Sequence, residues 1–166
     1  TNPDKIRALK ILGTDMLGRS VLSRVIFGAQ ASLTIAFLAT AFAAIGGLAV
    51  GLVVAYVRGP LEKIADILAA TLLAFPGVVL LLALVSVLNP STLTISVALS
   101  LVAAPSFMRM AKANAMSQAN KEYVIAAQAL GARLPRVILR ELLPNTLVPM
   151  ISLVAASVAL AIIVEG

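Results

Sequence analysis

The sequence predicts an all-α membrane protein, a polytopic bundle of transmembrane helices, and two observations support this prediction. Of the 166 residues, 61% are hydrophobic and only 12% are charged, and the mean hydropathy of +1.06 lies far outside the range of soluble domains. Three runs without any charged residue contain 33, 42 and 23 residues, whereas a helical span needs only about 20. These runs are 25–57, 67–108 and 142–164.

We expect about four spans, because the run of 42 residues is too long for one helix that crosses a bilayer. The break is expected at Asn89-Pro90, since proline disfavours helical geometry in the residue before it and Asn-Pro-Ser is a turn signal. Pro76 and Pro105 fall inside spans, where they either kink the helix or serve ordinary packing. The predicted spans are 31–57, 64–88, 92–110 and 146–164.

The first thirty residues begin with a polar, charged stretch and lack the early apolar region of a secretory signal. We expect residues 1–30 to form an extracytoplasmic or interfacial segment. Residues 31–166 are expected to form the transmembrane domain, with a loop at about 111–145. The absence of an initiator Met and the end directly after Gly166 lead us to expect a fragment of a longer polypeptide.

The distribution of Lys and Arg predicts the orientation. Six of them lie between Arg109 and Arg140 and none in the turn at 89–91, so the long loop is expected in the cytoplasm. Alternation of the spans places the connection at 58–63 inside as well and residues 1–30 outside. That outer segment carries five cations, which the positive-inside rule alone would not place there.

Several classes of function are disfavoured. The chain has no cysteine and no histidine, which excludes disulfides, thiolate chemistry, ordinary zinc sites and His-based catalysis. No ionisable residue lies at the centre of a predicted span, so an ion-coupled secondary carrier is the least favoured alternative. No G-x-x-x-x-G-K-[ST] phosphate-binding loop occurs, and we expect neither catalysis nor a bound metal or cofactor. The net charge of +6 fits basic cytoplasmic loops, and no nucleic acid partner is expected.

Small residues in the first predicted span form a G-x-x-x-G pair, Gly47 and Gly51. Such pairs let two helix backbones approach closely. We favour packing within this chain over contact with a second subunit, although the motif serves both.

The long loop contains an amphipathic helix-turn-helix pattern. Gly131 is expected to end the first helix and Pro135 to begin the second, and the Leu143-Pro144-Asn145 corner is expected to lead into the last span. An amphipathic pair of this kind suits either lipid headgroups or a soluble partner, and a shallow alanine surface favours a protein cleft. The apolar face of the first helix consists of Tyr123, Ala126, Ala127 and Leu130.

These residues carry a resemblance to a known family. E-Y-V-x-A-A-x-A-L-G-A at 122–132, followed by R-x-x-L-P-N at 140–145, resembles the EAA loop of permease subunits in binding-protein-dependent ATP-binding cassette importers. L-G-T-D-x-L-G-R-x-x-x-S-R at 12–24 and A-F-P at 74–76 resemble segments of the peptide and nickel branch. The family's full chain has a further span on each side of the region present here.

The resemblance implies an all-α permease that forms half of a pore for small peptides or a related solute, such as glutathione or a nickel chelate. Its implied location is the cytoplasmic membrane of a bacterium or archaeon. The implied partners are ATPase subunits that bind ATP and Mg, a second related permease and an extracytoplasmic solute-binding protein. The implied coupling residues are Glu122, Ala126, Ala127, Gly131, Arg133, Leu143, Pro144 and Asn145. The N-terminal family motif comprises Gly13, Thr14, Asp15, Gly18, Arg19, Ser23 and Arg24.

A membrane scaffold is the main alternative. Such a protein would recruit some other soluble partner through the same loop, and it shares every feature of that loop. Only the identity of the partner separates the two interpretations.

Overall fold

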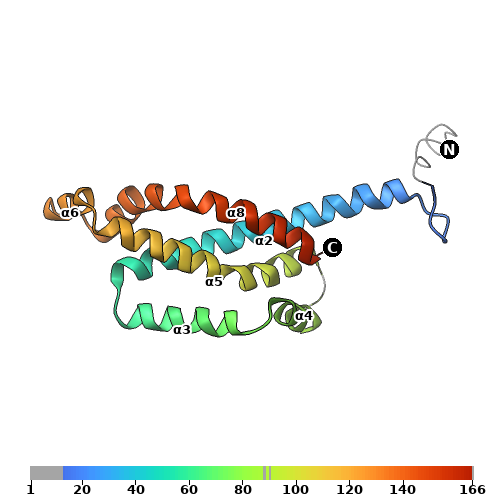
Figure 1. The fold of residues 1–166 in the computed structure, drawn as a ribbon, viewed down its shortest axis with the longest axis horizontal. Helices are drawn as coiled ribbons and strands as arrows, with labels where there is room; N and C mark the ends of the chain where they lie inside the picture. The colour runs from blue at the N-terminus through green and yellow to red at the C-terminus, as the bar shows by residue number, and fades with distance from the viewer. Residues whose placement is uncertain (1–12, 88, 90, 166) are drawn as a thin grey trace.

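The computed structural model is a bundle of long helices, shown in Figure 1, and it describes residues 13–87, 89 and 91–165. Within those residues no strand forms, and the all-α class is confirmed. The elements are α2 (Val21–Val57), α3 (Pro60–Ala74), α4 (Gly77–Val87), α5 (Thr92–Ala119), α6 (Glu122–Ala129), α7 (Leu134–Arg136), the π-helix η1 (Val137–Leu142) and α8 (Leu143–Glu165).

The number of spans agrees with the prediction. In the described part of the chain, three helical stretches are long and apolar enough to cross a membrane, and α3 with α4 provides a fourth if the bent pair is one span. The helix limits differ from the predicted ones, since α2 begins at Val21 instead of 31 and α5 continues to Ala119. At about 1.5 Å per residue, the 37 residues of α2 exceed the ~30 Å hydrocarbon thickness.

The segment predicted as the second span is broken at Pro76, the proline expected either to kink it or to serve packing, and the chain bends by 92° between α3 and α4. Phe75 adopts an extended conformation with φ −83° and ψ 138°. The following Pro76 has no N–H to donate, and its ring disfavours helical geometry in the preceding residue. Pro105, by contrast, is buried inside α5 without ending it. Leu88 and Pro90 lie outside the described residues.

The centre of the bundle is the contact between α2 and α5, and glycines allow it. A Cβ added to Gly47 would lie 2.6 Å from Phe107 Cβ, and one added to Gly51 would lie 2.7 Å from the carbonyl oxygen of Met108. Both distances are shorter than real Cβ contacts. The prediction of packing within the chain is therefore confirmed for this pair. Neighbouring Gly46 has nothing within 4 Å of such a Cβ.

The two ends of the bundle carry different segments. In Figure 1, α6 and the connection from α2 to α3 lie at one end, and the turn that precedes α2 lies at the other. This agrees with the predicted placement of 58–63 and the long loop on the same side of the membrane. The assignment of that side to the cytoplasm stays a prediction.

Candidate coupling elbow

The elbow, residues 122–136, comprises α6, a glycine turn and α7. Gly131 has φ +80°, a conformation that side chains disfavour. Around it, the N–H of Ala132 donates to the Ala127 carbonyl at 3.0 Å and the N–H of Gly131 donates to the Gln128 carbonyl at 2.9 Å. This pair of bonds is the Schellman helix end. The prediction that Gly131 ends the first helix is confirmed.

The second arm of the elbow begins as predicted, with Pro135 in the first turn of α7. However, the chain does not turn again before the last span. α7, η1 and α8 form one helical stretch, Leu134–Val164. The expected corner at 143–145 was therefore wrong, because Leu143, Pro144 and Asn145 form the first turn of α8 within that stretch.

The π-helical segment η1 has a local cause. Pro144 cannot donate to the Arg140 carbonyl four residues earlier, and its ring would clash with that oxygen in an α-helix. The chain widens instead, and the N–H of Leu143 donates to the carbonyl of Ile138, five residues before it. The side-chain amide of Asn145 donates to the Glu141 carbonyl at 2.8 Å. Proline and asparagine together stabilise the wide turn.

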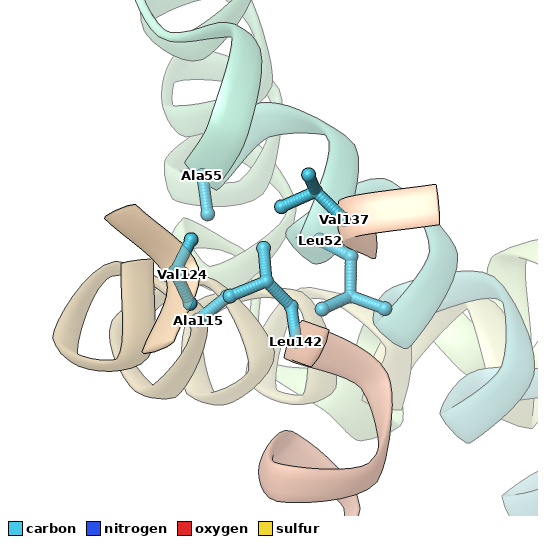
Figure 2. Close-up of a cluster of buried hydrophobic side chains, with 6 residues drawn as sticks. All are labelled: Leu52, Ala55, Ala115, Val124, Val137 and Leu142. Atoms are coloured by element: carbon cyan, nitrogen blue, oxygen red, sulfur yellow. The ribbon is translucent and has the colours of Figure 1, made fainter. Parts of the chain in front are cut away.

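Val124 anchors the elbow to the bundle. Its side chain is fully buried in a cluster contributed by four elements, α2, α5, α6 and η1, as Figure 2 shows. This burial stabilises the contact by about 2 kcal/mol for a valine side chain. The cluster consists of Leu52, Ala55, Ala115, Val124, Val137 and Leu142.

The opposite face of α6 is open. Leu130 is 90% exposed and Ile125 is 55% exposed, and Ala126 beside them is exposed as well. Helical spacing predicted an apolar face with Tyr123 and Leu130 but missed the roles of Val124 and Ile125. Three consecutive apolar residues at 123–125 cover most directions around a helix, so periodicity could not tell which of them points inward.

A chain of hydrogen bonds ties α6 to the ends of α5 and α8. The Asn145 side-chain amide donates to the Tyr123 hydroxyl at 3.2 Å, and the Tyr123 hydroxyl lies 3.1 Å from the Gln118 side-chain oxygen. Burial raises the pKa of the Tyr123 phenol and nearby Glu141 raises it further, against the hydrogen bond from Asn145, which lowers it. The phenol therefore keeps its proton at neutral pH. A longer contact of 3.4 Å joins Gln128 to Tyr56 at the end of α2.

The two charged residues predicted to couple lie at the surface of the elbow. Glu122 occupies the first turn of α6 and Arg133 precedes α7, and both are exposed. Neither makes an ion pair with another residue that the structure describes. Their charges are therefore free to meet a partner.

At the other end of the molecule, the N-terminal hook, residues 13–20, contains most of the second predicted motif. Asp15 accepts hydrogen bonds from the N–H groups of Leu17 and Arg19, both at 2.9 Å, and forms an ion pair with Arg24 at 2.9 Å. The backbone bond from Arg19 contributes most to lowering the pKa of this carboxyl.

The backbone of the hook is turned tightly. Gly13 and Gly18 both have positive φ, and a bridge joins Thr14 to Ser20. Ser23 donates its N–H to the Ser20 hydroxyl at the helix start. Leu12, Lys5, Arg7 and Lys10 lie outside the described residues.

Residues 47–164, well over half of the chain, match a protein family described as the binding-protein-dependent transport system inner membrane component. The chain belongs to this family. The match begins within α2 and continues to the last residues of α8, so it includes the whole elbow. The resemblance found in the EAA-like residues is thereby confirmed.

Curated relatives of this chain carry peptide and glutathione transport names. The dipeptide transport system permease protein DppC of Haemophilus influenzae is 33% identical over 153 residues, which cover 92% of this chain and 52% of the relative. DppC of Alkalihalophilus pseudofirmus is 34% identical over 139 residues, 84% of this chain and 46% of the relative. The glutathione transport system permease GsiD of Pectobacterium atrosepticum is 26% identical, covering 92% and 50%. The chain spans about half the length of these relatives.

An ion cluster that the sequence did not predict joins α3 and α5. The Lys112 ammonium lies 2.8 Å from a Glu62 carboxylate oxygen and 2.6 Å from an Asp66 oxygen. The Lys112 side chain is only 13% exposed, whereas those of Glu62 and Asp66 are 25% and 44% exposed. The i, i+4 spacing of the two carboxylates predicts that they share one helix face. No residue near them in the sequence indicates that Lys112 is their partner.

An apolar cavity of about 370 Å³ lies between α2, α4, α5 and α8. Its polar lining is limited to the hydroxyls of Thr40, Ser106 and Ser157 among the described residues. A charged or zwitterionic solute would lose its hydration there without gaining a charged partner. The cavity by itself is therefore suited to apolar groups.

Proposed function

We propose that this chain supplies helices of the permease subunit of an ATP-driven importer. In the proposal it forms half of a translocation pore in the cytoplasmic membrane of a bacterium or archaeon. The family match over residues 47–164 supports the permease role. The names of the curated relatives, dipeptide, peptide and glutathione transport permeases, support small peptides or glutathione as solutes, with nickel chelates as an alternative.

The proposed partners follow from the same family. They are ATPase subunits that bind ATP and Mg, a second related permease and an extracytoplasmic solute-binding protein, all within a lipid membrane and without nucleic acid. The chain itself is proposed to bind no cofactor. The apolar cavity lacks the charges that would bind peptide termini, so recognition of the solute is expected at the binding protein or between two permease subunits.

One observation carries the proposed coupling role of the elbow: α6 is anchored on one side and open on the other. Val124 is fully buried in the bundle, while Ile125 on the same short helix and Leu130 at its C-cap are exposed. A helix held in this way can transmit displacement from a partner to the bundle. The Gly131 turn limits its length to about two turns, which suits insertion into a protein cleft.

A substitution in the glycine turn tests this role in the complete importer. Gly131→Trp places a large ring where the space within 4 Å is empty, so the loss should come from the docking surface and the strained backbone. We expect normal membrane insertion, with transport and transport-dependent ATP hydrolysis reduced at least tenfold. The matched control is Gly131→Asn, because asparagine tolerates positive φ and adds little bulk. It should retain most of the transport.

Two results would overturn the proposal. One is normal transport by Gly131→Trp in reconstituted vesicles. The other is cross-linking that places the elbow outside the cytoplasm, using a cysteine introduced at Leu130 in this cysteine-free chain. Copurification of the loop with a soluble protein other than an ATPase would instead favour the scaffold interpretation.

A further inference from the structure

We propose that Tyr123 is a positioning residue that locks α6 to the end of α5 and the start of α8, so that both long helices follow the elbow when it moves. This inference rests on the proposed coupling function and names the side chains that transmit it. Tyr123 contacts both partners through one hydroxyl oxygen. Gln118 lies in the last turn of α5 and Asn145 in the first turn of α8.

The direction of the hydrogen bonds follows from the backbone. The Glu141 carbonyl is an acceptor, so the group of Asn145 that faces it at 2.8 Å must be the amide NH₂. The same NH₂ has a second hydrogen, which it donates to the Tyr123 oxygen at 3.2 Å. The Tyr123 proton is then free for the Gln118 carbonyl oxygen at 3.1 Å. Every donor in this chain of bonds has its own acceptor.

The hydrogen bonds of Tyr123 supply a directional constraint that the buried apolar cluster cannot supply. Val124 contacts α2, α5 and η1 through apolar atoms, and such contacts are not directional, so these contacts alone would let α6 roll about Val124. Tyr123 is the adjacent residue and lies about 100° away around the helix axis. Two anchors in different directions prevent rolling. When a partner displaces α6 through its open face, α5 and α8 then move with it as a rigid translation.

The wide turn before α8 positions the Asn145 side chain to bind the Tyr123 hydroxyl. η1 ends at Leu142, and Asn145 binds the Glu141 carbonyl inside that segment. One side chain therefore both satisfies the π-helix and reaches α6. Loss of this amide should loosen the π-helical turn and the elbow together.

Tyr123→Phe is the direct test, made in the full-length permease assembled with its ATPase subunits, second permease and solute-binding protein in vesicles. The ring and its packing remain, and only the hydroxyl is lost. We expect the thermal transition to fall by only about 2–4 °C. Copurification of the ATPase should be unchanged. The number of ATP molecules hydrolysed per dipeptide imported should rise about fivefold, the effect expected from losing one such hydrogen-bonded link.

The other tyrosine provides a matched control. Tyr56→Phe removes the same group from a residue whose hydroxyl accepts a weaker hydrogen bond, from Gln128 at 3.4 Å, and it should change the ratio less than twofold. Gln118→Glu keeps an acceptor for the Tyr123 proton and should couple nearly normally, whereas Gln118→Leu should resemble Tyr123→Phe. This rescue by the conservative variant separates a specific acceptor from a merely structural residue.

Equal coupling ratios in Tyr123→Phe and the wild-type importer would overturn the inference while leaving the proposed function intact. An equal loss in Gln118→Glu and Gln118→Leu would also contradict it, because the bond direction would then be wrong. If the wild-type assembly shows no ATP-dependent import at all, the proposed function fails instead. The two failures are therefore distinguishable.

Discussion

The α2–α5 contact and the α3 helix show two different ways of holding a helix in this bundle. α2 buries ten residues, and its glycines bring its backbone against α5. α3 buries only Ala69, and its strongest tie to α5 is the ion cluster of Lys112 with Glu62 and Asp66. Close backbone packing stabilises the contact between α2 and α5, whereas ion pairs stabilise the contact between α3 and α5.

The difference indicates which parts of the bundle can move. Backbones in direct contact cannot shift without losing many packing contacts at once, so α2 and α5 should act as one body. α3 is attached by long side chains, and it begins after Arg58 and Gly59, which both have positive φ. For Arg58 that conformation is strained. We infer that α3 can change its position at lower cost than α2.

The largest expected effect comes from breaking the glycine contact. Gly47→Leu should destabilise the protein by about 3 kcal/mol or more, because its Cβ would overlap Phe107 Cβ and the backbone N of Met108, which cannot rotate away. A thermal unfolding measurement in detergent would detect this change. Gly46→Leu is the control on the same turn of α2, where an added Cβ meets nothing, and it should be nearly neutral. Similar losses in both variants would mean that the loss does not come from the close contact with α5, because Gly46 does not take part in that contact.

Breaking the ion cluster should have an intermediate effect. Lys112→Met leaves two carboxylates without their cation, and we expect a loss of about 1–2 kcal/mol, because both acids remain partly exposed to water. The measurement is the labelling rate of a single cysteine placed at Ala69, the buried residue of α3, which should increase as α3 detaches. Arg109→Met removes a cation with no ion pair among the described residues and serves as the control. An unchanged labelling rate in Lys112→Met would show that α3 does not depend on charge.

The smallest effect is expected at the N-terminal hook, where both arginine partners of Asp15 are exposed to water. The pKa of Asp15 is lowered in the folded protein, so its stabilisation is complete above the ordinary value of 3.8 and is lost as the pH falls through the lower folded value. A spin label on Met16→Cys, at a fully exposed position, should become more mobile in that acidic range and not between pH 5 and 8. Asp15→Asn should show high mobility at neutral pH. If the mobility of the spin label does not depend on pH, the Asp15 carboxylate does not stabilise the hook.

Local sequence determined the features that depend only on neighbouring residues. The uncharged runs determined which segments can enter a membrane, because the hydrocarbon tolerates few charges. Gly131 determined where α6 ends and Pro135 where α7 begins, since their backbone preferences are intrinsic. Pro76 marked the position of a break, although its size of 92° depends on what α3 and α4 contact.

Only the tertiary structure decided the features that join distant segments. Local periodicity could not choose Val124 as the buried residue of α6, because that choice depends on residues of α2 and η1 that meet it in space. Lys112 donates a hydrogen bond to Asp66, which lies 46 positions away in the sequence, and Asn145 donates one to Tyr123, 22 positions away. Side-chain partners at such separations are set by how the helices pack against one another, and no local pattern of residues encodes that packing.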